Sequence, residues 1–307
     1  MSQETPRVSI GMPVFNEARF LRESLDSLLN QEYRDFELII SDNASTDETG
    51  QICEEYASRD SRIRYFRNEK NLGMTLNFFE GFKRARGDYF MMAAGHDLRN
   101  RDYLRRCVEV LDHHPEVILA YGRTDACDLD GNFVCVIPVY AETRGLSASE
   151  RLRKVIRNTG SCFLMYGVIR IDPLRQSSIL IESYGADTIV IAELSLQGEF
   201  WHIPETALVA RMPEDRKLTD EENTARLISA ERAHQKSGIF MTKYPHAQLM
   251  LQLLRIVRQS NLSSMQKISL AFDIIGWLKI AVLKEFTVKQ IPEGIRNVFK
   301  RAVTHAD

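Results

Sequence analysis

Residues 8–49 read VSIGMPVFNEARFLRESLDSLLNQEYRDFELIISDNASTDET. The segments 7–15 and 36–42 are largely apolar, which predicts two strands, the second of them covered on both faces. Between the strands, leucines recur at helical spacing and predict a helix. The helical pattern consists of Leu21, Leu25, Leu28 and Leu29. Strand, helix and strand in this order are typical of a parallel βαβ unit.

The alternation of strand and helix continues to about residue 122. Ser45 and Glu48 fit a capping box, which predicts that a second helix begins there. The repeated pattern therefore predicts an α/β fold with a doubly wound, mainly parallel sheet. Further strands are predicted at 63–68, 88–94 and 117–122, and further helices at 75–85 and 103–111.

A different pattern follows residue 122. The segment 124–137 predicts a hairpin that turns at Asp130 and Gly131. Strand-like segments, a second capping box and a helix ended by Gly198 come next. These features lie at 161–170, at 200–212 with a break at Pro204, at Ser147 with Glu150, and at 184–197.

The chain is therefore expected to have two parts. Residues 1–214 form the α/β domain. Residues 215–307 form a helical C-terminal region that packs on this domain, on another subunit, or against a membrane surface. Five Lys and Arg residues follow or flank the most apolar stretch of this region, where they can reach anionic headgroups. They are Lys284, Lys289, Arg296, Lys300 and Arg301.

Composition excludes several classes of protein. The formal net charge is −2, so a basic field for nucleic acid is not indicated. None of the five cysteines forms a CxxC pair, so neither a zinc site nor a disulfide framework is predicted. No signal peptide is recognised, and no apolar run reaches the length of about 18 residues that a spanning helix needs. The composition is that of a protein in a reducing, cytoplasmic compartment.

Three polar clusters follow predicted strands. They occupy 13–17, 42–47 and 96–97. Because ligands of such sheets bind at the carboxyl ends of the strands, we expect these clusters to converge on one crevice. Carboxylates there bind a ribose, a base or a divalent cation. The first βα turn lacks GxGxxG and no GxxxxGK[ST] occurs, which argues against a dinucleotide dehydrogenase and a P-loop NTPase.

The stretch 8–49 resembles the opening of the family 2 inverting glycosyltransferases, which have a GT-A fold. The likeness continues through NLGMTLNFFEGFKRARGDYF at 71–90. It resumes in YGVIR at 166–170 and in YGADTIVIAELSLQGEFWHIPETALVAR at 184–211. It covers about the first 210 residues in the right order. The resemblance implies a GT-A fold and transfer of a sugar with inversion at the anomeric carbon.

The resemblance also implies roles for individual residues. Asp187 matches the acidic residue that usually serves as catalytic base. The positions expected beside the nucleotide sugar are Pro13, Phe15, Glu17, Asp42, Asn71, Gly73 and Asp97. Those expected on the acceptor or diphosphate side are Tyr166, Arg170 and Arg211. Plainer interpretations stay open: Asp42 caps a helix, Gly73 serves a turn with positive φ, and Asp187 complements a helix dipole.

The sequence departs from the family where a divalent cation, Mn²⁺ or Mg²⁺, is usually held. The family pattern places Asp-x-Asp, often with one more Asp, after the strand at 88–94. Here Ala94 and His96 occupy the first two acidic positions, and Asp97 keeps the third. A histidine that often follows the late strand is also missing, because Met212 and Pro213 follow Arg211.

Three interpretations of this site remain. In the first, His96 and Asp97 hold the cation, with low affinity for Mg²⁺ because imidazole brings no negative charge. In the second, protonated His96 and arginines such as Arg99 and Arg211 neutralise the departing diphosphate. In the third, the site has decayed and the protein binds without catalysing.

The sequence thus predicts a glycosyltransferase of surface polysaccharide or glycolipid synthesis. A UDP-sugar is the favoured donor, and a glycan or a lipid-linked molecule is the acceptor. A homo-oligomer and a peripheral position at the inner face of the membrane are compatible with it. One alternative is a catalytically silent nucleotide-sugar-binding protein acting in a complex. Another, a sugar nucleotidyltransferase, needs a Gly-rich basic loop after the first strand, and GMPVFNEARF is not one.

Overall fold

The computed structural model describes residues 5–139, 141–157, 162–178, 184–212 and 244–290. Contacts divide the chain into two compact units. The first comprises residues 1–182 and 186–235, and the second comprises residues 183–185 and 236–307. The predicted boundary between residues 214 and 215 lies outside the described residues.

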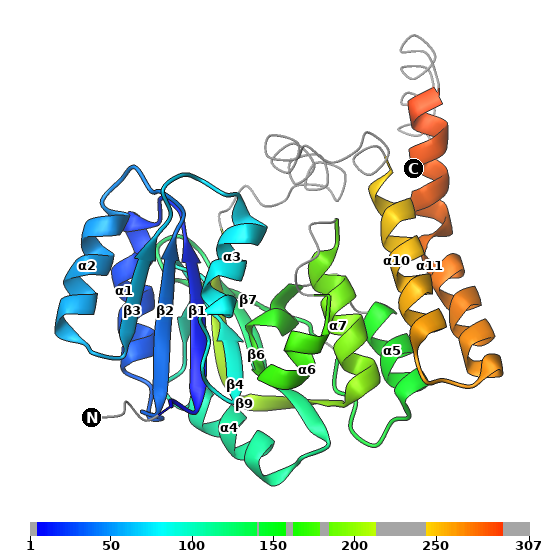
Figure 1. The fold of residues 1–307 in the computed structure, drawn as a ribbon, viewed down its shortest axis with the longest axis horizontal. Coiled ribbons are helices and arrows are strands. Elements are labelled where there is room, and N and C mark those ends of the chain that lie inside the picture. The colour runs from blue at the N-terminus through cyan, green and yellow to red at the C-terminus, as the bar shows by residue number, and fades with distance from the viewer. Residues whose placement is uncertain (1–4, 140, 158–161, 179–183, 213–243, 291–307) are drawn as a thin grey trace. The chain divides into compact units, whose positions relative to one another are not determined.

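In the described part of the first unit, the strands form one mixed sheet of nine (Figure 1). Its order is β3-β2-β1-β4-β8-β6-β9-β5, with β7 paired to β6. Strands β3, β2, β1 and β4 are parallel to one another, and so are β6 and β9, whereas β8 runs antiparallel between β4 and β6. The prediction of a mainly parallel α/β sheet is confirmed. The strands are β1 Val8–Val14, β2 Phe36–Asp42, β3 Ile63–Arg67, β4 Tyr89–Met92, β5 Leu98–Arg99, β6 Val117–Cys127, β7 Phe133–Ile137, β8 Val168–Arg170 and β9 Glu199–Arg211.

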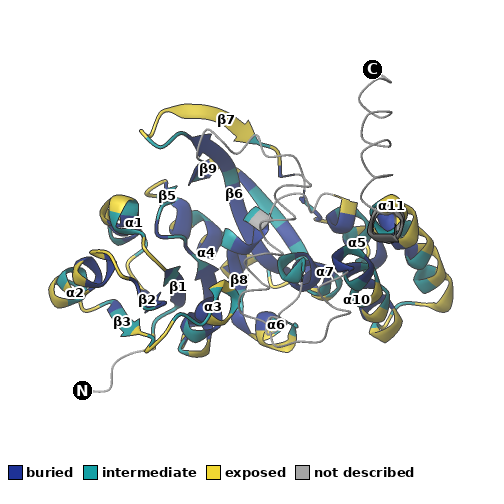
Figure 2. Ribbon diagram, turned by 90° about the horizontal axis from the view of Figure 1, so that it is seen from above, coloured by how far each residue is buried: buried dark blue, intermediate teal, exposed yellow. Residues whose placement is uncertain are grey.

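Helices cover both faces of this sheet, and alternating strand residues supply the two cores. On one face Ile10 and Met12 of β1 pack with apolar residues of α1, α2 and α4. On the other face Ile39 and Phe90 pack with α3, α5, α6 and α7. Figure 2 shows the buried strands between these two layers. The helices are α1 Ala18–Leu29, α2 Thr49–Arg59, α3 Met74–Lys83, α4 Tyr103–His113, α5 Ala148–Arg157, α6 Ile171–Gln176 and α7 Ala186–Gln197.

The parallel strands bring several loops to one edge of the sheet. The last residues of three strands lie side by side, because Val14 pairs with Asp42 and Asp42 pairs with Arg67. The loop after β4 leaves at the same edge, where the Ala93 N–H donates to the carbonyl of Gly11. This edge is called the carboxyl edge below, and the candidate site is built on it.

Two local predictions are wrong, and hydrogen bonding explains one of them. Helix α2 begins at Thr49 instead of Ser45, because the Ser45 N–H donates to Asp42 Oδ1 and Asp47 Oδ1 accepts from the Thr49 N–H. The residues before the helix therefore form a side-chain-supported turn. Strand β9 is continuous through Pro204, with a register shift against β6 in place of the predicted break.

The segment 161–170 is only partly a strand. It contains the 3-10 helix η1, Cys162–Tyr166, followed by the three residues of β8. The two-residue strand β5 was not anticipated. The hairpin at Asp130 and Gly131 is confirmed, with Gly131 at φ 87°. The capping box at Ser147 is also confirmed, because its N–H donates to Glu150 Oε2 over 2.9 Å.

The second unit contains the helices α10, Pro245–Gln259, and α11, Ser264–Gln290, which pack against each other. Among the described side chains of α11, the buried apolar residues are Leu270, Ile274 and Leu278. Within the described residues, we find no helix whose length and apolar content would let it span a bilayer.

Candidate functional site

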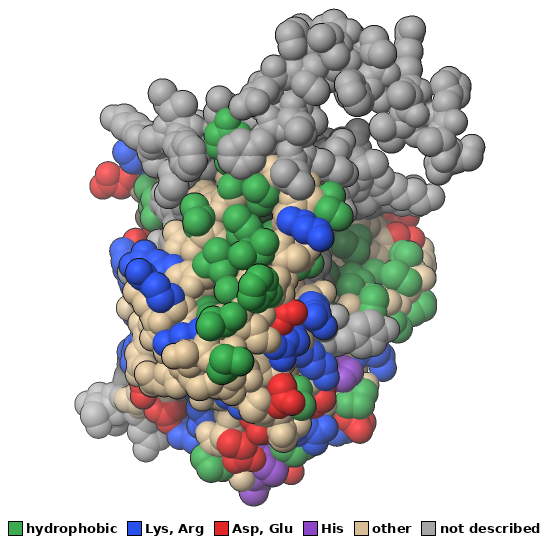
Figure 3. Space-filling model, turned by 90° about the vertical axis from the view of Figure 1, so that its right-hand side faces the viewer, with side chains coloured by type: hydrophobic (Ala, Val, Ile, Leu, Met, Phe, Trp, Pro, Cys, Tyr) green, Lys and Arg blue, Asp and Glu red, His purple; other side chains and the backbone are tan. Residues whose placement is uncertain are grey.

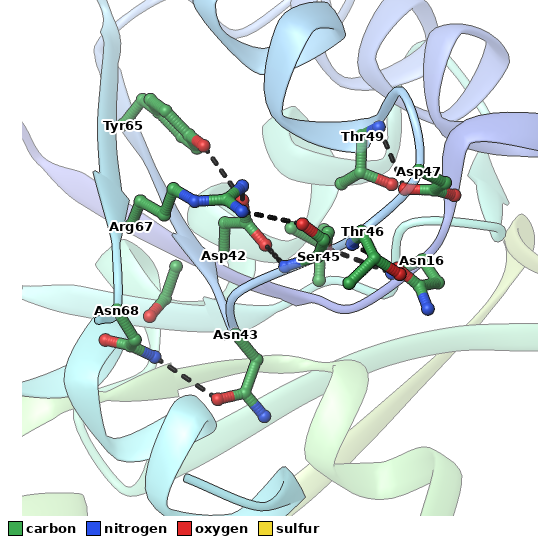
Figure 4. Close-up of polar contacts among 12 residues, drawn as sticks. Asn16, Asp42, Asn43, Ser45, Thr46, Asp47, Thr49, Tyr65, Arg67 and Asn68 are labelled. Carbon is green, nitrogen blue, oxygen red and sulfur yellow. Dashed lines mark hydrogen bonds and ion pairs between the residues drawn. The ribbon is translucent and has the colours of Figure 1, made fainter. Parts of the chain in front are cut away.

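The loops after β1 and β2 are hydrogen-bonded to each other at the carboxyl edge (Figure 4). The Asn16 N–H donates to Ser45 Oγ over 3.0 Å, and Asn16 Oδ1 accepts from the Thr46 N–H over 2.8 Å. Asn16 and Ala44 have φ of 55° and 61°, a region that residues other than glycine rarely adopt. Such conformations persist where the surroundings enforce them, and they cluster at functional sites. Phe15, at 43% exposure, projects from the first of these loops.

Asp42 lies at the centre of this edge and is fully buried. Its Oδ1 accepts from the Ser45 N–H, and its Oδ2 accepts from Tyr65 Oη over 2.9 Å and from Arg67 Nη1 over 2.5 Å. Arg67 also donates to the Ser45 carbonyl over 2.6 Å (Figure 4). Both carboxylate oxygens thus already have donors, while the Arg67 side chain keeps 46% of its surface exposed. The group that this cluster presents to solvent is a guanidinium, and the predicted contact of Asp42 with a base or ribose stays a prediction.

Asn71 and Gly73 form a turn that is fixed to the end of β2. Asn43 donates through Nδ2 to Asn71 Oδ1 over 2.8 Å and accepts from the Leu72 N–H over 2.7 Å. The Gly73 N–H donates to Asn71 Oδ1 over 2.8 Å, and Gly73 has φ 87°. A side chain at Gly73 would be strained at this φ, so glycine is required by the turn itself. The turn lies at the carboxyl edge, and the predicted contact of Asn71 and Gly73 with the nucleotide sugar stays a prediction.

His96 joins the loop after β4 to the loop after β1. Its Nδ1 lies 3.1 Å from both carboxylate oxygens of Glu17, and its Nε2 lies 3.7 Å from Asp97 Oδ1. Gly95 permits this approach, since a Cβ there would lie 3.1 Å from the Glu17 side chain. The structure therefore brings together three residues that the sequence assigned to one site. Two carboxylates thus face one imidazole ring from its two nitrogens.

Two buried arginines support the loop after β4. The Arg211 N–H donates to Asp97 Oδ1 over 3.0 Å, and the Arg211 guanidinium donates to the His96 carbonyl and to Glu23. Arg99 donates to the Met92 carbonyl over 2.8 Å. Among the described residues, Arg99 Nε, Arg99 Nη1 and Arg211 Nε have no hydrogen-bond partner. Within the described part of the chain, the buried Arg99 guanidinium has no carboxylate that would neutralise its charge, an arrangement that costs free energy. Arg99 therefore places a fixed positive charge close to this edge.

The side chains at this edge do not fit a divalent cation as they are arranged. Mg²⁺ and Mn²⁺ prefer several oxygen ligands that converge on one point. Glu17 and Asp97 instead face opposite nitrogens of His96, and Asp97 accepts from Arg211. In the part of the chain that the structure describes, no three His, Cys, Asp or Glu side chains are grouped as metal ligands.

Asp187 lies in the first turn of α7 and is half-buried. Burial raises the pKa of its carboxyl group above the ordinary value, against a hydrogen bond from the Thr188 N–H that lowers it. Helix α7 packs on η1, whose last residue is Tyr166. The Tyr166 carbonyl accepts from Tyr103 Oη over 3.3 Å. Within the described residues no hydrogen bond joins Asp187 to His96 or Asp97, so its role as base stays a prediction.

Arg170 lies away from the carboxyl edge. It pairs with Tyr89, the first residue of β4, and therefore lies at the opposite edge of the sheet. Its guanidinium donates to the carbonyls of Val117, Leu111 and His114, where it caps the end of α4. From Tyr166 the chain continues into β8, and Arg170 ends that strand at the edge opposite the carboxyl edge. This position does not support the predicted place of Arg170 on the acceptor or diphosphate side.

Residue types alone did not identify every polar group of the site. Arg67 and Tyr65 were missed, although Arg67 ends β3 just as Asp42 ends β2. The available signal was their shared position at strand ends, which a search for acidic residues does not use. Pro13 pairs with Ser41 inside the sheet, one residue before β1 ends.

Comparison with known proteins identifies the family. The model of a family described as glycosyl transferase family 2 matches residues 9–165, about half of the chain. The chain belongs to glycosyl transferase family 2. All three loops of the carboxyl edge lie within the matched residues of this family 2 member.

Several curated proteins resemble this family 2 member over part of their length. An uncharacterized glycosyltransferase of Haemophilus influenzae is 32% identical over 133 residues, which are 43% of this chain and 52% of that protein. The abequosyltransferase RfbV of Salmonella typhimurium is 34% identical over 125 residues, 40% of this chain and 38% of that protein. The matched region is thus about half or less of each relative.

Solved structures confirm a GT-A type fold for this family 2 member. The crystal structure of S. aureus TarS 1–349 in complex with UDP-GlcNAc has a TM-score of 0.67 at 16% identity, covering 94% of this chain and 77% of that one. The mannosyltransferase PcManGT from Pyrobaculum calidifontis, in complex with GDP-Man and Mn²⁺, has a TM-score of 0.56 at 14% identity, covering 99% and 81%. At these identities the likeness concerns the fold.

Proposed function

We propose that this family 2 member is an inverting glycosyltransferase that moves a sugar from a nucleotide diphosphate sugar to an acceptor hydroxyl. The observation that carries the proposal is the carboxyl edge. There the end of β3 and the loops after β1 and β4 bring Arg67, Glu17 and His96 to one side of the sheet. Doubly wound sheets bind nucleotides at this edge. Charged groups of both signs suit a ligand that carries hydroxyls and a diphosphate.

Asp187 is the proposed general base. The acceptor oxygen attacks the anomeric carbon, its proton passes to the Asp187 carboxylate, and the bond from that carbon to the diphosphate oxygen breaks. The diphosphate leaves with the electron pair, and one displacement of this kind inverts the anomeric carbon. The raised pKa of the Asp187 carboxyl makes its carboxylate a stronger base than an exposed aspartate.

Fixed cations are proposed to neutralise the departing diphosphate. His96 faces Glu17 and Asp97, and Arg211 and Arg99 lie buried behind the same loop. Positive charge held in place before the reaction stabilises the charge that develops on the leaving group. Of the three interpretations of the sequence, this arrangement favours the one without a tightly bound cation. A weakly held Mn²⁺ or Mg²⁺ is the competing result.

The substrates follow from the same reasoning. A UDP-sugar remains the favoured donor, and the TarS and PcManGT structures contain UDP-GlcNAc and GDP-Man, respectively. A glycan or a lipid-linked molecule is the proposed acceptor, within surface polysaccharide or glycolipid synthesis, to which an abequosyltransferase among the relatives is relevant. The proposed location is the cytoplasm, with peripheral attachment at the inner face of the membrane.

A thermal-shift panel tests the donor class. UDP-, GDP- and dTDP-sugars are each added with Mn²⁺, Mg²⁺ or EDTA. A ligand that binds only the native state raises the melting temperature by mass action. We expect the UDP-sugars to raise it, and to do so in EDTA as well. No shift with any donor, under any of the three conditions, contradicts the proposal.

The His96→Ala variant tests the role of His96. We expect turnover to fall on the order of 10²-fold, because one group that stabilises the leaving diphosphate is lost. We also expect His96→Asp, which restores the acid of the family pattern, to make turnover depend on Mn²⁺. Steady-state kinetics with a Mn²⁺ titration measure both. His113→Ala, an exposed histidine at the end of α4, is the matched control and should change neither.

The alternative is a silent nucleotide-sugar-binding protein. Ala94 and His96 in the acidic positions favour it, while Asp187 in its expected place favours the enzyme. The two differ in one measurement, the release of free nucleotide diphosphate when donor and membrane-derived acceptors are supplied. If full activity persists in His96→Ala with an unchanged Mn²⁺ response, His96 has no direct role in either case.

A further inference from the structure

The exposed face of α11 has an unusual composition. Six large apolar residues stand on it beside two serines, one glycine and one lysine, and no acidic residue of the described side chains is exposed there. Phe272 is 73% exposed and Met265 77%. Figure 3, which turns the right-hand side of Figure 1 toward the viewer, shows hydrophobic side chains gathered in a band. The apolar residues are Met265, Ile268, Phe272, Ile275, Trp277 and Ile280.

This face is separate from the packing contact of the helix. Over residues 264–282, α11 buries Leu270, Ile274 and Leu278, and α11 packs on α10. A helix with one packed side normally places charged and polar residues on the other. Here the outward side is apolar as well. An exposed apolar surface of this extent marks a contact with a partner or a membrane.

The net charge of residues 264–307 distinguishes between a membrane surface and a second copy of the chain as the partner of this face. Residues 264–307 contain seven Lys and Arg against four Asp and Glu, whereas the whole chain has a net charge of −2. Two copies of a basic helix repel each other, but an anionic surface attracts both. Among the described side chains of α11, Lys279 is the single charged residue in the exposed class, and Asp273 on the same face is half-buried. The charge balance therefore favours an anionic partner over a second copy.

The width of the apolar face also favours a membrane surface over a second copy of the chain. At about 100° per residue, the six apolar side chains occupy an arc of roughly 200° around the helix axis. Ile275 lies at one end of this arc and Trp277 at the other. A coiled-coil seam occupies a narrower stripe. An interfacial helix sinks a broad apolar face between headgroups and acyl chains, and Trp and Phe are typical of that face.

We propose that the exposed face of α11 binds the surface of an anionic lipid bilayer. The helix lies in the plane of the interface, with Phe272, Ile268 and Ile275 below the headgroups. Lys279 extends its ammonium group back to the headgroup phosphates while its methylene chain stays among the apolar residues. The proposal concerns the second unit alone and does not rest on the proposed transfer reaction.

Vesicle flotation with the full-length protein tests the proposal. Vesicles of phosphatidylcholine alone are compared with vesicles that also contain phosphatidylglycerol, at low and high salt. We expect binding to the anionic vesicles, weakened by salt. The double variant Ile268→Ser, Phe272→Ser should bind at least about tenfold more weakly, because less apolar surface enters the bilayer. Lys279→Glu should weaken binding while leaving the apolar residues in place.

The matched control is Phe133→Ser on β7. Phe133 is 66% exposed, close to the value for Phe272, but lies in the first unit. The Phe133→Ser variant should bind vesicles as the unaltered protein does. Circular dichroism and thermal unfolding confirm that each variant is folded, as expected for substitutions at exposed positions.

Three results overturn the proposal. One is equal binding to neutral and anionic vesicles. Another is an equal loss of binding in Phe133→Ser and in the α11 double variant. The third is a dimer in sedimentation velocity that binds no vesicles and that Ile268→Ser, Phe272→Ser converts to a monomer. That result would assign the face to a second copy of the chain.

Discussion

Asp187→Asn is expected to lower the rate of sugar transfer roughly 10²–10⁴-fold, the usual contribution of a positioned general base. Asparagine has nearly the same shape but cannot accept the hydroxyl proton. Donor binding should persist, because the proposed nucleotide contacts lie on other loops. Single-turnover kinetics together with donor titration separate the two effects. Transfer at the unaltered rate would show that another group is the base.

The pH dependence of Asp187 gives a second readout. Burial raises the pKa of its carboxyl group, so transfer should fall with decreasing pH at a higher pH than for an ordinary aspartate. The same shift favours folding below the ordinary carboxyl pKa, and this benefit is lost as pH rises through the folded value. Asp187→Asn should therefore be more stable than the unaltered protein at neutral pH, and the difference should vanish in acid.

The matched control for Asp187 is Asp172→Asn. Asp172 also lies in the first turn of a helix, α6, but its side chain is 80% exposed. If the carboxylate of Asp187 served only the helix dipole, the two variants would lose similar, small amounts of stability and neither would lose transfer. We expect loss of transfer in Asp187→Asn alone.

Arg211→Met is expected to lower turnover on the order of 10²-fold with a smaller change in donor affinity. The guanidinium holds the carbonyl of His96, and a shift of about 1 Å in a positioning group can cost this much. Stability should change little. Methionine fills a similar apolar volume, and Glu23, at 61% exposure, returns to water. Turnover number, donor dissociation constant and denaturant unfolding are the measurements.

For Arg170→Met we expect the opposite outcome, a loss of stability with little change in turnover. Arg170 is another guanidinium that donates to main-chain carbonyls, but at the far edge of the sheet. Its removal leaves carbonyls at the end of α4 without this donor, so stability should fall by about 1–3 kcal/mol. Turnover of the folded variant should stay within about twofold. If Arg170→Met loses turnover and Arg211→Met does not, the assignment of the site to the carboxyl edge is wrong.

Local pattern predicted much of this fold. The apolar runs that became β1 and β2, and the leucine spacing of α1, depend only on neighbouring residues and the period of the element. Strand β5 has only two residues, and its existence depends on pairing with a partner far along the chain, as Leu98 pairs with Val209. Sequence neighbours carry no signal for such contacts.

For the site, too, features set by the local sequence pattern could be predicted, whereas features set by pairing between distant strands could not. The rule that ligands bind at strand ends was enough to place Glu17, His96 and Asp97 together. It could not reveal that Asp42 is already saturated, because this depends on the register that sets Asp42 beside Arg67. Nor could it show that Arg170 faces the other edge, because the direction of β8 is fixed by the sheet and not by its own residues.

The mutual hydrogen bonds of Asn16, Ser45 and Thr46 have a consequence for affinity. A flexible loop loses conformational entropy when a ligand orders it, and this loss subtracts from the binding free energy. Here hydrogen bonds within the chain hold the two loops to each other, so folding has already met that cost. The rotational freedom left to lose on binding belongs to exposed side chains of these loops, such as Phe15.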